Sequence, residues 1–84
     1  MIFPTIHING TAACDLIEDL SRASASLYQA ILDVERAGPN GRDYYPQGPG
    51  AIACAMREHE ARLTRLTIVR QEIEDIIEHV SHSL

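Results

Sequence analysis

Two long segments of this 84-residue chain contain neither proline nor glycine, and the twelve residues between them, 38–49, contain six of the nine. Residues 12–37 and 51–84 can each run as an unbroken helix, because proline and glycine are the residues that most often interrupt one. The Gly38–Pro39 pair is a strong stop signal for the first helix, and Pro49 suits the start of the second. The sequence therefore predicts two long helices joined by an unusually long connection.

The apolar residues of both segments recur in alternating steps of four and three, which is the seam of an antiparallel helix pair. We expect an all-α fold, a single domain built as an antiparallel two-helix hairpin. Its parts are an extended arm (1–10), a helix (11–37), a loop (38–49) and a second helix (50–82). The seam positions are Ala13, Ile17, Leu20, Ser24, Leu27, Ile31 and Val34 in the first helix, and Ile52, Met56, His59, Leu63, Leu66, Arg70, Ile73, Ile77 and Val80 in the second.

Local signals predict how the segments begin and turn. Ile6 and Ile8 flank His7, a weak alternation that indicates an extended arm or one short strand. The Asn9-Gly10-Thr11 run predicts a turn followed by a capped helix start. Asn40–Gly41 is a second turn signal, with backbone conformations of positive φ available to it.

The apolar stripes are wider than a single neighbouring helix can cover. Ile68, Val69 and Ile76 lie beside the seam of the second helix. Eighty-four residues are also few for a self-sufficient core. We therefore expect the hairpin to pack with copies of itself into a homo-oligomeric helical bundle.

Two polar residues, His59 and Arg70, occupy seam positions of the second helix. Single polar residues in a seam commonly fix register or oligomeric state. His59 could instead line a pocket near the loop together with Arg57. For Arg70 we expect an acidic partner from another helix, such as Glu18 or Asp19.

Composition excludes several classes of function. The net charge is −5, whereas proteins that bind nucleic acids generally present a basic face. No segment approaches the ~20 apolar residues of a membrane span, and the first residues lack the basic region of a signal peptide. Cys14 and Cys54 would lie roughly 30 Å apart in a hairpin, too far for a disulfide. We expect a cytoplasmic protein with reduced, buried cysteines.

The connecting loop is the candidate binding site, because it gathers ligand-type side chains between rigid proline and glycine positions. Arg42 can hold a phosphate in a bidentate contact, Tyr44 or Tyr45 can stack on a base, and Asn40 and Gln47 can read a base edge or a ribose. Arg57 and His59, early in the second helix, could close the pocket. Two other interpretations remain: a purely structural loop, or a surface for protein contact. The candidate residues are Asn40, Arg42, Tyr44, Tyr45, Gln47, Arg57 and His59.

Catalysis and metal binding have little support. The run from His59 to Arg62 lacks the second histidine of a zinc-protease motif. His79 and His82, with Asp75 and Glu78, have spacings that a metal could use, but helix ends are often rich in histidine because of the helix dipole. We expect no enzymatic activity, no metal and no cofactor.

The loop run Asn-Gly-Arg-Asp-Tyr-Tyr-Pro-Gln-Gly (40–48), followed by Glu58–His59 and Arg62, resembles a run in small uncharacterised proteins of tailed phages and prophages. The resemblance extends to residues 9–11 and so spans most of the chain. It implies a viral source and a host-cell location, and it brings no assigned active site. Small phage genes of this kind often encode counter-defence factors, including oligomeric helical proteins that sequester nucleotide immune signals.

These observations lead to one functional hypothesis and one alternative. The first is a non-enzymatic phage protein that forms a homo-oligomer and sequesters a small nucleotide-like signal at the loop end of the hairpin. The alternative is a protein-interaction module, either an inhibitor of a host defence complex or a phage assembly accessory.

Overall fold

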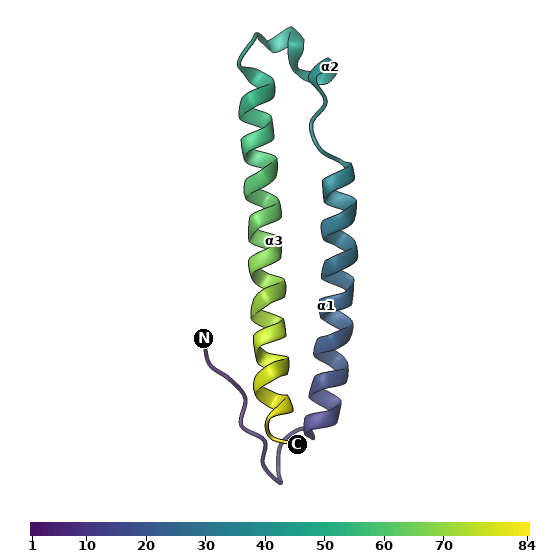
Figure 1. Ribbon diagram of the computed structural model, residues 1–84, viewed down its shortest axis with the longest axis vertical. Helices are drawn as coiled ribbons and strands as arrows, with labels where there is room; N and C mark the ends of the chain where they lie inside the picture. Colours follow the sequence, from purple (N-terminus) through teal and green to yellow (C-terminus); the bar gives the residue numbers. More distant parts are fainter.

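The computed structural model describes all 84 residues and contains helices but no strand. Two long helices, α1 (Ala13–Arg36) and α3 (Ala51–Ser81), lie side by side in opposite directions (Figure 1). The connection between them contains the short helix α2 (Gly41–Tyr44) and a 3₁₀ turn, η1 (Tyr45–Gln47). The C-terminus lies at the opposite end of the rod, and the N-terminal arm runs from beside α3 round that end to α1 (Figure 1). The predicted all-α class and helix pairing are confirmed.

The hairpin is long and thin, with extents of 61 × 21 × 17 Å. Its radius of gyration is 18.5 Å, whereas a compact domain of this length has about 12 Å. Such a rod has almost no interior. Only Ala13, Ser24, Ala55 and Val80 are buried, and Val80 alone is completely shielded from solvent.

The predicted seam is nonetheless the contact line between the helices. Every seam position of α1 is buried or half-buried, and so is every seam position of α3 except Met56. Met56 is 48% exposed because it lies in the first turns of α3, beyond the end of α1. The step pattern in the sequence thus identified the packing face of each long helix, and it failed only where no partner helix is opposite.

Two local predictions are wrong, and of the two alternatives for residues 1–9, an arm or a strand, the strand is absent. Helix α1 begins at Ala13 with Ala12 as the flanking residue, and no side chain caps it, so Thr11 does not serve as the cap. Asn40 and Gly41 do not form a turn with positive φ, because Asn40 caps α2 and Gly41 is its first residue. Residues 1–9 form no strand, although the predicted turn before α1 is present, with the Gly10 amide donating to the His7 carbonyl at 3.0 Å.

The N-terminal arm lies beside the last turns of α3 (Figure 1). The Phe3 ring stacks on the His79 ring with their centroids 4.6 Å apart and their planes 17° from parallel. Ile2 and Ile8 project into solvent on either side of this contact. Cys14 and Cys54 are unpaired as expected, but both are exposed, so the prediction that they fill the core is wrong.

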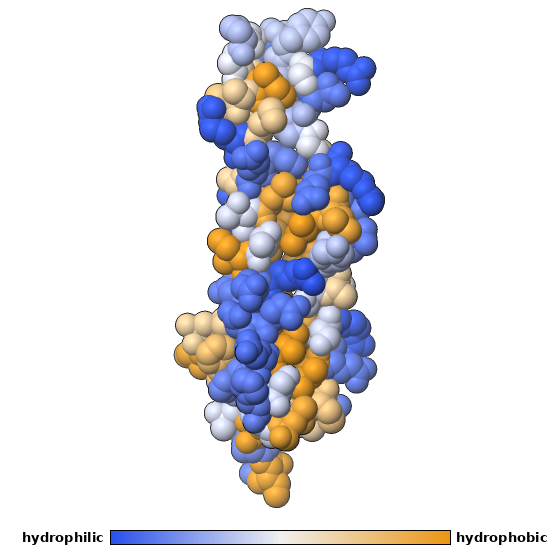
Figure 2. Space-filling view, viewed as in Figure 1, coloured by the Kyte–Doolittle hydropathy of each residue, from blue (hydrophilic) through white to orange (hydrophobic).

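Hydrophobic side chains remain visible over much of the surface. Figure 2 shows them in patches along the line between the long helices, separated by hydrophilic groups, and again at the end that holds the C-terminus. Neither long helix combines the length and the apolar character that crossing a lipid bilayer requires. The exposed apolar surface is therefore spread over a charged, acidic rod.

Candidate functional site

The loop holds its ligand-type side chains on short helices. The Asn40 side-chain oxygen accepts from the Arg42 amide at 2.9 Å, which caps α2, and from the Arg42 Nε at 3.4 Å. Both α2 and η1 contact the first turns of α3, so the connection folds onto the end of the rod. Gly48, with φ 109°, ends η1 in a backbone conformation that favours glycine. The loop therefore has regular local structure and a defined outer surface.

The outer surface of the loop carries most of the predicted binding residues. Asn40, Arg42 and Gln47 are exposed, and Tyr45 is 76% exposed. Tyr44 is half-buried. Of the predicted site, the structure joins Asn40 to Arg42 directly. No cavity is present at this end of the single chain.

The two residues predicted from α3 do not turn toward the loop's polar groups. The Arg57 guanidinium donates to Cys54 Sγ, one turn back along its own helix, at 3.2 Å. His59 lies in the seam against Gly38, and its Nε2 is buried without a hydrogen-bond partner. The structure thus places His59 at the base of the loop, as part of the helix contact.

The arginines divide into two groups by their partners. Arg22, Arg36 and Arg70 pair with carboxylates of their own helices at 2.6, 3.4 and 3.9 Å. The other four form no ion pair, and all of them belong to the loop or to the half of α3 that leads away from it. These unpaired arginines are Arg42, Arg57, Arg62 and Arg65.

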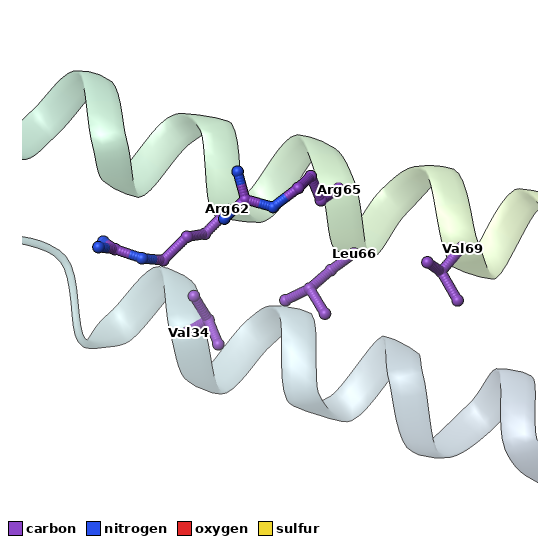
Figure 3. Close-up of a pocket in the computed structure, with 5 residues that line it drawn as sticks. All are labelled: Val34, Arg62, Arg65, Leu66 and Val69. Atoms are coloured by element: carbon purple, nitrogen blue, oxygen red, sulfur yellow. The ribbon is translucent and has the colours of Figure 1, made fainter.

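Two of the unpaired arginines border a hollow that sequence reasoning missed. It is lined by Val34 of α1 and by Arg62, Arg65, Leu66 and Val69 of α3, and it holds about 310 Å³. Figure 3 shows both arginine side chains extending toward the loop end of the hairpin, with Leu66 directed toward α1. The floor is apolar and the rim is cationic. The feature of the sequence that could have indicated this hollow is a pair of arginines, Arg62 and Arg65, three residues apart beside an apolar stripe.

A half-buried polar cluster joins the helices farther from the loop. Arg70 Nε donates to Ser24 Oγ at 3.1 Å, and Ser24 Oγ donates to Glu74 Oε1 at 2.5 Å. The Arg70 guanidinium also lies over the Tyr28 ring, 4.7 Å from its centroid. The expected partners Glu18 and Asp19 are therefore wrong: Arg70 meets a serine and a tyrosine across the seam and a carboxylate on its own helix. This cluster links α1 and α3 across the seam.

Comparison with protein-family models, with curated proteins and with solved structures finds no match. The function of the chain must therefore be inferred from the geometry of the hairpin and its loop.

Proposed function

We propose that this protein binds a small, anionic, nucleotide-like molecule at the loop end of the hairpin and acts by sequestering it. The observation that carries the proposal is the position of the four arginines without carboxylate partners. They occur only in the loop and along the adjoining half of α3. An arginine without an internal carboxylate partner has donors available for the phosphate or carboxylate of a ligand.

The neighbouring side chains suit a ligand with a ring as well as a charge. Tyr45 offers an exposed face for stacking, and Gln47 offers an exposed amide. Base stacking on an aromatic side chain contributes about 1–3 kcal/mol per base. Arg42, held by Asn40, would take the phosphate. The apolar hollow behind Arg62 is a second place where a base could lie.

Binding without turnover is the form of activity that these residues support. They supply donors and stacking faces, and the loop contains no serine or cysteine that could act as a nucleophile. The resemblance of the loop to a run in tailed-phage proteins adds a setting for sequestration. A phage protein that holds a host nucleotide signal lowers its free concentration and so blunts the defence that the signal triggers.

Native mass spectrometry of protein purified gently from cells tests the proposal. We expect a non-covalent adduct of nucleotide size that is released unchanged on denaturation. Titration of ligand-free protein with linear and cyclic mono- and dinucleotides then identifies the class. Arg42→Ala and Tyr45→Ala should each weaken the best binder about tenfold or more.

Arg22→Ala is the matched control, because Arg22 pairs with Asp19 at the far end of the rod. It should bind like the unaltered protein. If Arg42→Ala and Arg22→Ala bind every nucleotide equally well, the loop is not the site. If the adduct is hydrolysed or rearranged when it is recovered, the protein is an enzyme and sequestration is wrong.

A second candidate function, a protein-interaction module, is favoured by the acidic terminal end of the rod. Glu72, Asp75 and Glu78 follow one another along the last part of α3. A host protein recovered with this chain in a fixed ratio, and lost when Glu78 is changed to Arg, would support this alternative. Retention of the partner by Glu78→Arg would argue against it.

A further inference from the structure

Four ionisable residues follow one another at intervals of seven along α3: Glu58, Arg65, Glu72 and His79. Each stands one residue before a seam position, which turns it about 100° around the helix from that position and away from α1. All four are exposed. Glu58, Arg65 and Glu72 alternate in charge along a single line on the outer side of α3. His79 ends the line, and its ring is stacked on Phe3 of the N-terminal arm.

The line is complementary to the same line on a second copy that runs in the opposite direction. The four residues are arranged symmetrically about the midpoint between Ile68 and Val69. If a second α3 lies against the first in the opposite direction, Arg65 of each copy faces Glu72 of the other, so this ion pair occurs twice. Glu58 then lies level with His79 and the Phe3 ring stacked on it. A two-fold contact uses the same patch on both subunits, so this reciprocity is what such an interface requires.

The centre of the line is apolar and unprotected in the single chain. Ile68 and Val69 are 55% and 44% exposed. Ile68 and Val69 flank the line on its two sides. In the inverted pairing, Ile68 of one copy lies level with Val69 of the other. Carboxylate and guanidinium groups on either side of an apolar centre are typical of a specific helix–helix contact, in which the charges set direction and the apolar residues supply burial.

The charge of the whole rod is also unevenly distributed. Residues 1–29 and 66–84, the half that holds the termini, carry seven carboxylates against two arginines. Residues 30–65, the half that holds the loop, carry five carboxylates against five arginines. An inverted copy therefore places each acidic half, with a net charge of −5, beside a loop half with a net charge of zero. A copy in the same direction would place Glu58 on Glu58, Arg65 on Arg65 and acidic end on acidic end.

The exposed area is large enough to accommodate such a contact. A folded monomer of 9.3 kDa exposes about 5,000 Å² according to the size scaling of globular proteins, whereas this chain exposes 6155 Å². The excess is roughly 1,200 Å² per chain, and a standard interface buries about 800 Å² on each partner. The single hairpin thus leaves more surface open than one ordinary interface covers.

We propose that the outer side of α3, centred on Ile68 and Val69, binds the same side of a second copy in antiparallel orientation, with Arg65 of each copy paired to Glu72 of the other. The contact lies away from the loop residues Arg42 and Tyr45. It takes Arg65 into the subunit contact, and Arg42, Arg57 and Arg62 then remain for the proposed ligand. Loss of ligand binding in the loop variants leaves this contact intact.

Sedimentation velocity across a wide range of protein concentrations tests the proposal. The unaltered protein should sediment as a dimer or a larger even-numbered assembly. Arg65→Glu and Glu72→Arg should each shift the assembly to smaller species, because like charges then face each other at both copies of the pair. Glu60→Arg changes the net charge as much as Glu72→Arg does, but Glu60 lies off the line, so it should assemble like the unaltered protein.

Mixing the two charge-reversed variants gives the decisive test of the proposed pairing. An equimolar mixture of Arg65→Glu and Glu72→Arg should reassemble, since the first chain then has glutamates at both positions 65 and 72 and the second has arginines at both. The double variant Arg65→Glu/Glu72→Arg should also assemble by itself. The proposal is overturned if the unaltered protein sediments as one chain at every concentration, if the single variants match Glu60→Arg, or if neither the mixture nor the double variant reassembles.

Discussion

Gly48 has φ 109° and ψ 170°, a backbone region that only glycine populates freely. It joins η1 to the turn before α3 and is the one residue in the chain with positive φ. We expect Gly48→Ala to lower the free energy of unfolding by about 1–3 kcal/mol. The strain comes from the backbone conformation, since a Cβ at Gly48 would meet nothing within 4 Å. Urea denaturation followed by circular dichroism measures the change.

Gly41→Ala is the matched control for Gly48. Gly41 also has open space around its Cβ position, but it lies in α2 without positive φ. Alanine is a better helix former than glycine by about 1 kcal/mol, so Gly41→Ala should leave the protein as stable as before or more stable. Equal losses from the two substitutions would show that chain flexibility, and not the conformation of Gly48, determines the effect.

Asn40 is the residue that organises the candidate site. Its side-chain oxygen caps α2 through the Arg42 amide and also holds the Arg42 side chain. We expect Asn40→Ala to cost about 1 kcal/mol of local stability, as the loss of a helix cap does. Amide hydrogen exchange at Arg42 and Asp43 should become faster by roughly fivefold to tenfold. Asn40→Asp, which retains an acceptor oxygen, should exchange slowly; unchanged exchange in Asn40→Ala would rule out the cap.

Among the elements, the long helices could be predicted from the sequence and the loop could not. The seam of α1 and α3 repeats over many turns, so each position is supported by several others, and a single polar residue such as Ser24 does not disturb the pattern. The loop has no such repetition. Asn40–Gly41 is compatible with both a turn and a helix cap, and only the packing of α2 and η1 on α3 decides between them.

The candidate site was predicted in part for the same reason. Exposure of Arg42, Tyr45 and Gln47 followed from their polarity and from the proline and glycine around them. The convergence of Arg57 and His59 on the loop did not follow, because the direction of a side chain depends on its rotamer and its neighbours. Arg57 turns back to Cys54, and His59 packs against Gly38.

Substitution of Ser24 tests whether the polar cluster between the long helices helps to hold them in register. Ser24 is only 3% exposed, and its hydroxyl lies between Arg70 and Glu74. We expect Ser24→Ala to lower the free energy of unfolding by about 1–3 kcal/mol, since both partners lose a hydrogen bond in a half-buried site. Thermal denaturation followed by circular dichroism measures the loss.

Ser26→Ala is the control for Ser24, because Ser26 is exposed on the same helix. Alanine has the higher helix propensity of the two residues, so Ser26→Ala should be neutral or slightly stabilising. Ser24→Ala gains the same helix propensity. The stability lost with its hydrogen bonds must therefore exceed this gain for the free energy of unfolding to fall. If Ser24→Ala proves as stable as Ser26→Ala, the cluster does not contribute to holding the helices together.

The whole molecule is a rod in which four residues of 84 are buried, so its stability must depend on what covers its sides. Burial of apolar surface is the main favourable term in folding, and a single hairpin achieves little of it. If the outer side of α3 binds a second copy, folding and association are linked: the assembled state is favoured by mass action, and stability rises with protein concentration.

Such linkage makes the melting temperature depend on protein concentration. Raising the concentration from near the dissociation constant to a hundred times that value adds about 2 kcal/mol. For a chain of this length such a gain raises the melting temperature by on the order of 10 °C. Arg65→Glu, which places a like charge against Glu72 of the second copy, should melt lower and with little dependence on concentration. Glu60→Arg should keep the full dependence. A melting temperature of the unaltered protein that is constant with concentration would mean that the hairpin is stable alone, and that its exposed apolar side has no second copy to bind.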